Sequence, residues 1–473
     1  MNRYEKYNNS ELSWSETIPE HWDLKRIARV FDIRKEKNSP IKTKEILSLS
    51  AKYGVSLYSD KKEKGGNKPK EDLTSYNLCY PGDILINCMN IVAGSVGISN
   101  YFGAISPVYY PLVNMNQDEN CTRYMEYVFR NYDFQRSLVG LGKGIQMSEA
   151  DDGRLYTVRM RISWDMLKTQ LLPIPPMDEQ EQIANYLDWK INEIDRLIQV
   201  EKEKIKELKR LAFNVIAEFV LRGIDTQNYK KSNIEWIDDI PSHWNEVSIR
   251  GYVNIIRGNS SFTKDDLKNQ GKYVGLQYGK VYKTEIIDSD FHFYVSDKFY
   301  KNSQVVNRND IIIVSTSETV EDLGHTSFYD RDDIGLIGGE QILLKPLNNI
   351  NSKYLFYLSK VFRAQLQLCA TGIKVYRFKI SDLKQVYIPL PPIKEQKKIV
   401  SNIEYKLNQI DKRMKNNYDL IKELELLKQS LISEVVTGKI DVRNIVIPEY
   451  EKVVVLENET DELDEMEGIE DGN

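Results

Sequence analysis

Two stretches of the chain carry apolar residues at steps of three and four, the spacing of a narrow helical seam. The pattern predicts helices over residues 176–223 and 392–441. The seam positions of the first helix are Ile183, Leu187, Ile191, Ile194 and Ile198. Those of the second helix are Ile399, Ile403, Leu407, Ile410 and Met414. A long helix with so narrow a stripe needs a partner, and each stretch is the obvious partner of the other.

Each seam has a polar residue at the same missing step, Glu201 in the first helix and Asn417 in the second. Such a residue either fixes the register of a helix pair at some cost in stability or marks a local exit from contact, and both explanations stay open. The chain leaves one globular part through the first helix and the other through the second. Pairing of the helices is therefore expected to be antiparallel.

The regions before the helices also repeat. The first motif comprises six residues that recur at an offset of 222: Ser10, Trp14, Ile18, Pro19, His21 and Trp22 become Ser232, Trp236, Ile240, Pro241, His243 and Trp244. A second motif, residues 173–180, recurs as residues 389–396 at an offset of 216. The chain is therefore two copies of one unit, and in each copy a globular part is followed by a long helix.

Between these motifs the two halves share less. Residues 80–86 and 308–314 are predicted to be equivalent buried strands that follow a turn, whereas residues 115–160 and 317–375 align poorly. We therefore expect an α+β protein with two similar mixed α/β domains, separated by two long antiparallel coiled-coil helices and related by a pseudo-twofold repeat. The predicted domains are residues 1–175 and 224–391, and residues 442–473 are predicted to be an acidic, disordered tail.

Charge is distributed unevenly along the 473 residues. The net charge of −5 includes nine acids and no Lys or Arg in residues 457–473, so residues 1–456 carry +4. The total charge thus does not exclude a DNA-binding body. No window reaches the roughly 18 apolar residues of a membrane span, and the first residues lack a secretory h-region. The four cysteines show no CxxC pair, which favours a reduced, cytoplasmic protein.

Motifs that would indicate catalysis are missing from the sequence. It has no phosphate loop, no GxGxxG cofactor fingerprint and no His/Cys spacing typical of zinc, so we expect no catalytic residue, metal or cofactor in this chain. His21 and His243 are interpreted as packing and hydrogen-bonding residues beside a Trp. The candidates for contact with DNA are basic, amide or aromatic residues in loops, several beside glycine: Lys64, Lys68, Lys143, Arg161, Arg257, Asn259, Lys374, Tyr376 and Arg377. Any one of them could instead be a solvated surface charge.

Three motifs together resemble a known family. The Ser-x3-Trp-x3-Ile-Pro-x-His-Trp start, the Pro-Leu-Pro-Pro-Ile-x-Glu-Gln sequence before the second helix and the Thr-Gly-Lys-Ile-Asp-Val-Arg end at residues 437–443 are similar to those of the specificity subunit of type I restriction–modification enzymes. The resemblance spans about residues 10–443, and two of the motifs occur twice in order. The acidic end after residue 444 departs from the family pattern.

The resemblance implies that each globular domain reads one half of a split double-stranded DNA site. It also implies that the paired helices set the gap between the half-sites and dock two methyltransferase subunits. Two restriction subunits, where present, would add translocation and cleavage. S-adenosylmethionine, ATP and Mg would belong to those partners. The alternatives are a coiled-coil scaffold that binds only protein and, disfavoured by the missing motifs, a self-contained methyltransferase.

Overall fold

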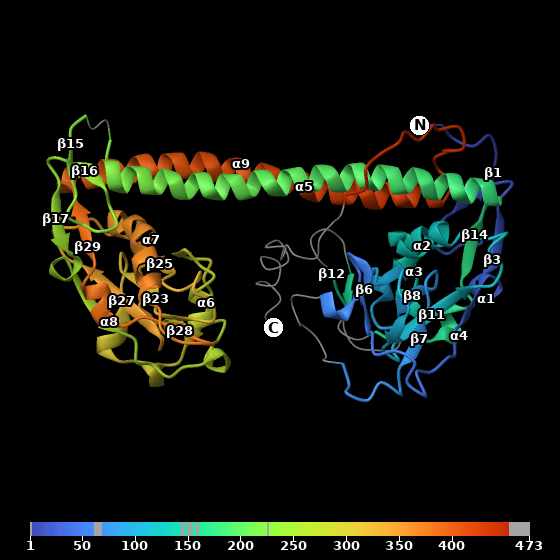
Figure 1. Cartoon of the computed structure of the whole chain (residues 1–473), viewed down its shortest axis with the longest axis horizontal. Coiled ribbons are helices and arrows are strands. Elements are labelled where there is room, and N and C mark those ends of the chain that lie inside the picture. Colours follow the sequence, from blue (N-terminus) through green and yellow to red (C-terminus); the bar gives the residue numbers. More distant parts are fainter. Residues whose placement is uncertain are drawn as a thin grey trace. The chain divides into compact units, whose positions relative to one another are not determined.

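The computed structural model describes residues 2–60, 69–142, 147–149, 155–157, 160–224 and 227–453. Its contacts divide the chain into two compact units, each of which contains part of both long helices (Figure 1). Unit 1 comprises Met1–Glu203 and Asn417–Asn473. Unit 2 comprises Lys204–Asn416.

Each unit is built on an antiparallel sheet with the same strand order. The sheet of unit 1 runs β4 (Phe31–Ile33), β11 (Tyr109–Asn114), β8 (Ile84–Asn87), β9 (Val96–Ile98). The sheet of unit 2 runs β18 (Val253–Arg257), β27 (Gln341–Pro346), β23 (Ile311–Val314), β25 (Thr326–Tyr329), and adds β20 (Ile286–Ile287) parallel to β25. The register also agrees, because Leu112 pairs with Ile33 and Ile84 in unit 1, as Leu344 pairs with Ile255 and Ile311 in unit 2.

The strands predicted at residues 80–86 and 308–314 are the buried strands β8 and β23, so this prediction is confirmed. The turn before each strand is closed in the same way. Asp83 accepts a hydrogen bond from the Tyr80 N–H at 3.0 Å, and Asp310 accepts one from the Asn307 N–H at 2.8 Å. The residue before each aspartate has a positive φ. This residue is Gly82 in unit 1 and Asn309 in unit 2, and Gly and Asn adopt this conformation more readily than other residues.

A helix packs on each sheet, α2 (Thr122–Arg130) in unit 1 and α7 (Ser352–Leu368) in unit 2. The inner face of α2 is fully buried at Tyr124, Met125, Val128 and Phe129. On α7, the buried Tyr354, Leu355, Leu358 and Phe362 join the main core of unit 2. Two-stranded ribbons lie where each domain meets the long helices: β1–β2 (Tyr7–Asn9, Thr17–Pro19), β3–β14 (Asp23–Arg26, Leu171–Ile174), β15–β16 (Tyr229–Lys231, Asp239–Pro241) and β17–β29 (Asn245–Ser248, Tyr387–Leu390).

The remaining described strands and helices of the two domains are short. In unit 1 they are α1 (Ile27–Val30), β5 (Leu47–Ser50), β6 (Gly54–Leu57), β7 (Asn77–Cys79), β10 (Gly103–Ile105), α3 (Tyr132–Ser137), β12 (Met147–Glu149), β13 (Leu155–Thr157) and α4 (Trp164–Leu167). In unit 2 they are β19 (Tyr273–Leu276), α6 (Tyr278–Val281), β21 (Tyr294–Val295), β22 (Val305–Val306), β24 (Thr316–Ser317), β26 (Gly335–Ile337), β28 (Tyr376–Arg377) and α8 (Ile380–Lys384).

The two long helices are α5 (Met177–Arg222) and α9 (Ile393–Val436). In unit 2, Ile216 and Val220 near the end of α5 share a buried core with Ile399 and Ile403 near the start of α9, so the helices pair antiparallel there. In unit 1 an ion pair of 2.6 Å joins Asp195 of α5 to Lys428 of α9. Most seam residues named from the sequence are buried, namely Ile183, Leu187, Ile194, Ile198, Ile399, Ile403 and Ile410, while Ile191, Leu407 and Met414 are half-buried.

The segment after α9 differs from expectation in part. Residues 442–453, predicted as the start of a disordered tail, follow α5 of unit 1 as an extended segment held by hydrogen bonds to Gln182 and Asn192. The prediction was wrong there because it rested on charge, and the nine acids begin only at Glu457. Residues 454–473 lie outside the described part of the chain.

Candidate functional site

The first motif of each half binds the start of the long helix that follows it. In unit 1, His21 Nε2 lies 2.8 Å from Glu179 Oε2, and Trp22 Nε1 donates to Glu179 Oε1 at 2.9 Å. In unit 2, His243 and Trp244 make the same two contacts with Glu395, at 2.8 and 3.1 Å. Glu179 and Glu395 are equivalent in the sequence repeat. Both histidines therefore position a helix.

A glutamine next to each glutamate ties the helix to the domain. Gln180 Oε1 accepts from the Cys121 N–H just before α2, and Gln396 Oε1 accepts from the Asn351 N–H just before α7, at 2.8 and 2.7 Å. The first full turn of α2 and of α7 adds a second matched contact. Tyr124 donates to Pro173 O, and Tyr354 donates to Pro389 O. We call the His–Trp–Glu and Gln contacts of each unit its helix lock.

Each unit also holds the end of the other long helix. The Tyr7 hydroxyl donates to Gly438 O after α9 in unit 1, and the Tyr229 hydroxyl donates to Arg222 O at the end of α5 in unit 2, at 3.0 and 3.3 Å. Gly438 has a φ of +71°, and a Cβ there would lie 2.4 Å from the Pro19 ring, so a larger residue would be strained and crowded. Each unit thus binds the start of one long helix and the end of the other.

The candidate residues of unit 2 lie at one end of its sheet. Arg257 ends β18, and the next residue, Gly258, donates from its N–H to Gln341 O at the start of β27. The adjacent Glu340 carbonyl accepts from the Ser315 N–H after β23, and Ser315 O accepts from the Phe378 N–H, which follows β28. A continuous run of backbone hydrogen bonds therefore connects the loop after β18 with the segment around β28.

Asn259 lies in the loop after Arg257 and is held from both sides. Its N–H donates to Gln304 Oε1 at 2.7 Å, and Lys301 Nζ donates to its backbone and side-chain oxygens at 3.0 and 3.1 Å. The side chain of Arg257 is exposed, and its backbone oxygen accepts from the buried Gln304. Asn259 can therefore offer its amide NH2 group to a ligand while its oxygen stays paired.

Lys374, Tyr376 and Arg377 belong to a protruding turn. The backbones of Thr371 and Arg377 exchange two hydrogen bonds of 2.9 Å, and β28 pairs with β24. Gly372 has a φ of +134°, and a Cβ there would lie 2.0 Å from Val375 O, so only glycine fits. At the tip, Ile373 is 92 % exposed, and the Lys374 side chain is exposed as well. Exposed apolar and cationic side chains on a braced turn suit contact with a partner.

Arg161 lies at the matching place in unit 1. The Ile162 N–H donates to Cys88 O, as the Phe378 N–H donates to Ser315 O in unit 2. Electrostatic interaction with the nearby Cys88 and a hydrogen bond with Tyr110 raise the pKa of Arg161, and its side chain is exposed. The structure therefore places Arg161 and Arg377 at equivalent positions, as their offset of 216 predicts.

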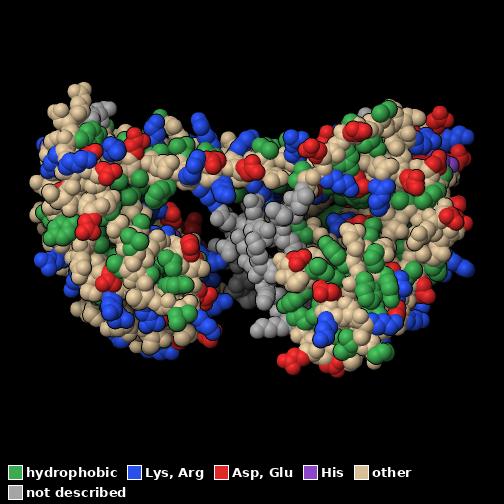
Figure 2. Space-filling model, viewed as in Figure 1, with side chains coloured by type: hydrophobic (Ala, Val, Ile, Leu, Met, Phe, Trp, Pro, Cys, Tyr) green, Lys and Arg blue, Asp and Glu red, His purple; other side chains and the backbone are tan. Residues whose placement is uncertain are grey.

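Three other candidates, Lys64, Lys68 and Lys143, lie outside the described residues. On the face drawn in Figure 2, Lys and Arg side chains are interspersed with acidic and uncharged ones over each unit. No group of His, Cys, Asp and Glu in the described ranges could hold a metal ion. Of the helices that the structure describes, none combines the length and apolar character needed to cross a membrane.

Comparisons with known proteins agree with this geometry. Residues 241–426 match the family described as type I restriction modification DNA specificity domain. The chain is 23% identical to a putative type I restriction enzyme MjaX specificity subunit of Methanocaldococcus jannaschii, over 93% of this chain and 97% of that protein. It is 25% identical to the type I restriction enzyme EcoBI specificity subunit of Escherichia coli, over 58% of this chain and 59% of that protein.

A solved structure has a similar fold. It comes from work on complex assembly and conformational transition of the type I restriction–modification system, and it matches with a TM-score of 0.61 at 16% identity, over 89% of this chain and 99% of that one. The fold is a duplicated mixed α/β domain with two long helices, and residues 241–426 of the chain match a DNA specificity domain. The chain is therefore similar, over nearly its whole length, to a specificity subunit of a type I restriction enzyme, and its residues 241–426 match the DNA specificity domain of such enzymes.

Proposed function

We propose that each unit reads one half of a bipartite DNA site, with the contacts made at the sheet end that carries Arg161 in unit 1 and Arg377 in unit 2. The observation that carries the proposal is that one framework occurs twice with different side chains at this end. The equivalent exposed side chains there are Lys35 and Arg257, and the framework beneath them also differs, with the buried Cys88 in place of Ser315 and Tyr109 in place of the buried Gln341. Side chains that differ in donors, acceptors and size suit two different base sequences.

The paired helices are proposed to set the gap between the two half-sites. Each helix lock fixes one domain to the start of a long helix. A change in helix length should therefore change the distance between the two domains. Inserting one heptad in both helices, beside Glu201 and Asn417, adds about 10 Å at ~1.5 Å per residue. We expect the gap to lengthen by about three base pairs at ~3.4 Å per base pair.

The measurement is the map of methylated bases in cells that carry the inserted chain. A matched control replaces seven residues at the same places without changing helix length, and it should leave the gap as it was. An unchanged gap after the insertion would reject the spacer role.

A truncation tests the two-reader proposal independently. A chain that ends at Arg222 keeps one domain and one helix, and two such chains can pair through the exposed seam. The proposal predicts methylation at a palindromic site or at no site. Methylation of the complete original asymmetric site would contradict it.

Two methyltransferase subunits are proposed to dock on the helices and to bring S-adenosylmethionine. Restriction subunits, where present, would bring ATP and Mg. The competing function, a scaffold that binds only protein, is supported by the long helix pair. Binding of duplex DNA by the complex with methyltransferase subunits separates the two, because affinity should fall steeply with salt only if phosphates are contacted.

A further inference from the structure

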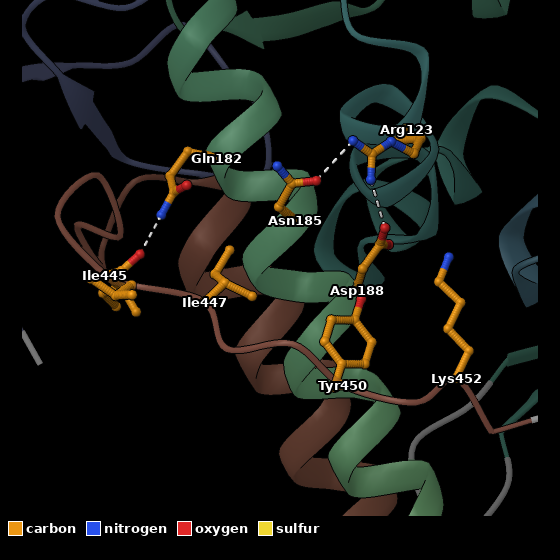
Figure 3. Close-up of a pocket in the computed structure, with 9 residues that line it drawn as sticks. Arg123, Gln182, Asn185, Asp188, Ile445, Ile447, Tyr450 and Lys452 are labelled. Atoms are coloured by element: carbon orange, nitrogen blue, oxygen red, sulfur yellow. Dashed lines mark hydrogen bonds and ion pairs between the residues drawn. The ribbon is translucent and has the colours of Figure 1, made fainter.

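Residues 442–453 lie along the first half of α5 in unit 1, and we call this segment the strap (Figure 3). Two side chains of α5 bind its backbone. Gln182 Nε2 donates to Val442 O and Ile445 O at 2.9 and 2.7 Å. Asn192 Nδ2 donates to Glu451 O at 3.0 Å, and Asn192 Oδ1 accepts from the Val453 N–H at 2.7 Å. The strap therefore covers about three turns of one helix face.

After Val442, the strap buries little of its surface against this face of α5. A cavity of about 590 Å³ remains beside it, lined by α2 and α5 through Arg123, Asn185 and Asp188 and by Tyr450 of the strap. Val446 is 88 % exposed, and other strap residues are at most half-buried after Val442. Water can replace backbone hydrogen bonds, and little apolar surface opposes release. Residues 445–453 of the strap can therefore leave while Val442 stays in the core of unit 1.

Chain topology leaves unit 2 without such a segment. In unit 1, the Asp441 N–H donates to Asn2 O, so the chain after α9 meets the beginning of the chain and continues as the strap. At the matching place in unit 2, the chain after α5 continues into β15 at Tyr229, the counterpart of β1 at Tyr7. The described residues that follow there pair as β15 with β16 and enter the second domain, so they form no strap.

Within the described part of the chain, no segment like the strap covers the matching helix face in unit 2. Asn408 of α9 corresponds to Asn192, is exposed and has no hydrogen-bond partner for its side chain among the described residues. Tyr405, which corresponds to Trp189, is 63 % exposed. The support beneath the two faces is the same, because Arg123 pairs with Asp188 at 2.7 Å in unit 1 and Lys353 pairs with Glu404 at 2.5 Å in unit 2.

Two matched faces fit two copies of one partner. We propose that the strap masks one of two equivalent docking faces for the methyltransferase subunit. The first methyltransferase subunit then binds α9 of unit 2, and the second binds α5 of unit 1 only after the strap has left. This inference rests on the proposed docking of methyltransferase subunits on the long helices.

The test is titration of three chains with the methyltransferase subunit of the same host, followed by native mass spectrometry and calorimetry. The chains are the full chain, one that ends at Val453 and keeps the strap, and one that ends at Asn444 and lacks it. We expect equal affinity for the first subunit in all three. The second subunit should bind at least tenfold more tightly to the chain that ends at Asn444 than to the other two.

Three other outcomes would contradict the inference. Equal second steps in all three chains overturn the strap inference alone. If the chain that ends at Val453 already binds the second subunit more tightly than the full chain, the effect belongs to residues 454–473, and the strap inference is overturned. Absence of binding to every chain removes the proposed docking itself, and the strap inference falls with it.

A locked strap provides an independent variant in the full chain. Asn192→Cys with Lys452→Cys places two thiols where Asn192 brackets residue 452, in a Cys369→Ser background because Cys369 is exposed while Cys79, Cys88 and Cys121 are buried. The oxidised chain should bind the second subunit at least tenfold more weakly than the same chain after reduction. Equal binding before and after reduction would contradict the inference.

Discussion

The two units are alike where they hold the long helices and different where they are proposed to meet DNA. The helix locks repeat atom for atom: an indole N–H donates to Glu179 or Glu395, and a backbone N–H donates to Gln180 or Gln396. At the far end of the sheet, equivalent exposed positions carry an ammonium group at Lys35 and a guanidinium group at Arg257. The contrast indicates that a shared framework fixes the geometry while a few side chains set what is read.

The locks themselves differ in burial, and this gives the largest expected effect on stability. Glu179 is 4 % exposed and also accepts from Tyr4, whereas the Glu395 side chain is 21 % exposed. Glu179→Ala leaves the buried Tyr4 and Trp22 and the exposed His21 without their acceptor and should lower the free energy of unfolding of unit 1 by about 3 kcal/mol, while Glu395→Ala should lower that of unit 2 by about 1–2 kcal/mol. Urea unfolding of the full chain measures both.

Glutamine at the same position is the matched control, because it keeps one acceptor oxygen and should recover part of each loss. Equal losses for Glu179→Ala and Glu395→Ala would show that burial does not separate the two locks.

Removal of one guanidinium group should change the recognition of only one half-site. Arg377→Ala should reduce discrimination in the half read by unit 2 by about 1–3 kcal/mol, the usual value of a bidentate contact with a base. Arg161→Ala should act on the other half by a similar amount. Methylation rates on oligonucleotides with single base changes in each half measure this. A loss of discrimination in both half-sites after either substitution would contradict the proposal that each unit reads one half-site.

Lys374→Ala should have a smaller, sequence-independent effect. A lysine on an exposed turn acts on phosphates, so its removal should weaken DNA binding uniformly and reduce the slope of log K against log salt by about 1. Affinities at several salt concentrations give this slope. Lys439→Ala, on an exposed residue after α9, is a matched control that should leave the slope unchanged.

Cysteine reactivity gives the smallest expected difference between the units. Burial raises the pKa of Cys79 to about 12 and also raises that of Cys88, so both should stay unmodified by iodoacetamide at pH 8. Cys369 of unit 2 is exposed, and its pKa is raised by partial burial and by Asp382. Its alkylation should therefore accelerate from pH 8 to pH 10 as thiolate forms. Peptide mass spectrometry checks this, and rapid labelling of Cys79 in folded protein would contradict the packing.

Much of the architecture could be predicted from sequence because it rests on periodic patterns. The seam spacing predicted both long helices, and the apolar runs after the turns at Asp83 and Asp310 predicted equivalent strands. The match of α2 and α7 was missed because most of their residues differ. A short signal was present: Thr122, Arg123 and Tyr124 recur in kind as Ser352, Lys353 and Tyr354, and these tyrosines and cations make the matched contacts.

The site was harder to predict, since it depends on contacts between distant segments. The loop after Arg257 and the turn at Lys374 are separated by more than a hundred residues and are connected only through Glu340 and Ser315. The sequence indicated residue types but not this connection. The strap was missed for a related reason, because the side chains that hold it, Gln182 and Asn192, bind its backbone and leave no pattern in its sequence.

A graft between the units tests the central claim most directly. Residues 249–386, between β17 and β29, are replaced by residues 27–170, the equivalent segment between β3 and β14, so both helix locks remain. Methylated bases are then mapped in cells that supply the methyltransferase subunit. Two identical readers predict a symmetric site, in which the half-site of unit 1 occurs twice as an inverted repeat. Methylation that remains at the original asymmetric site would contradict the account.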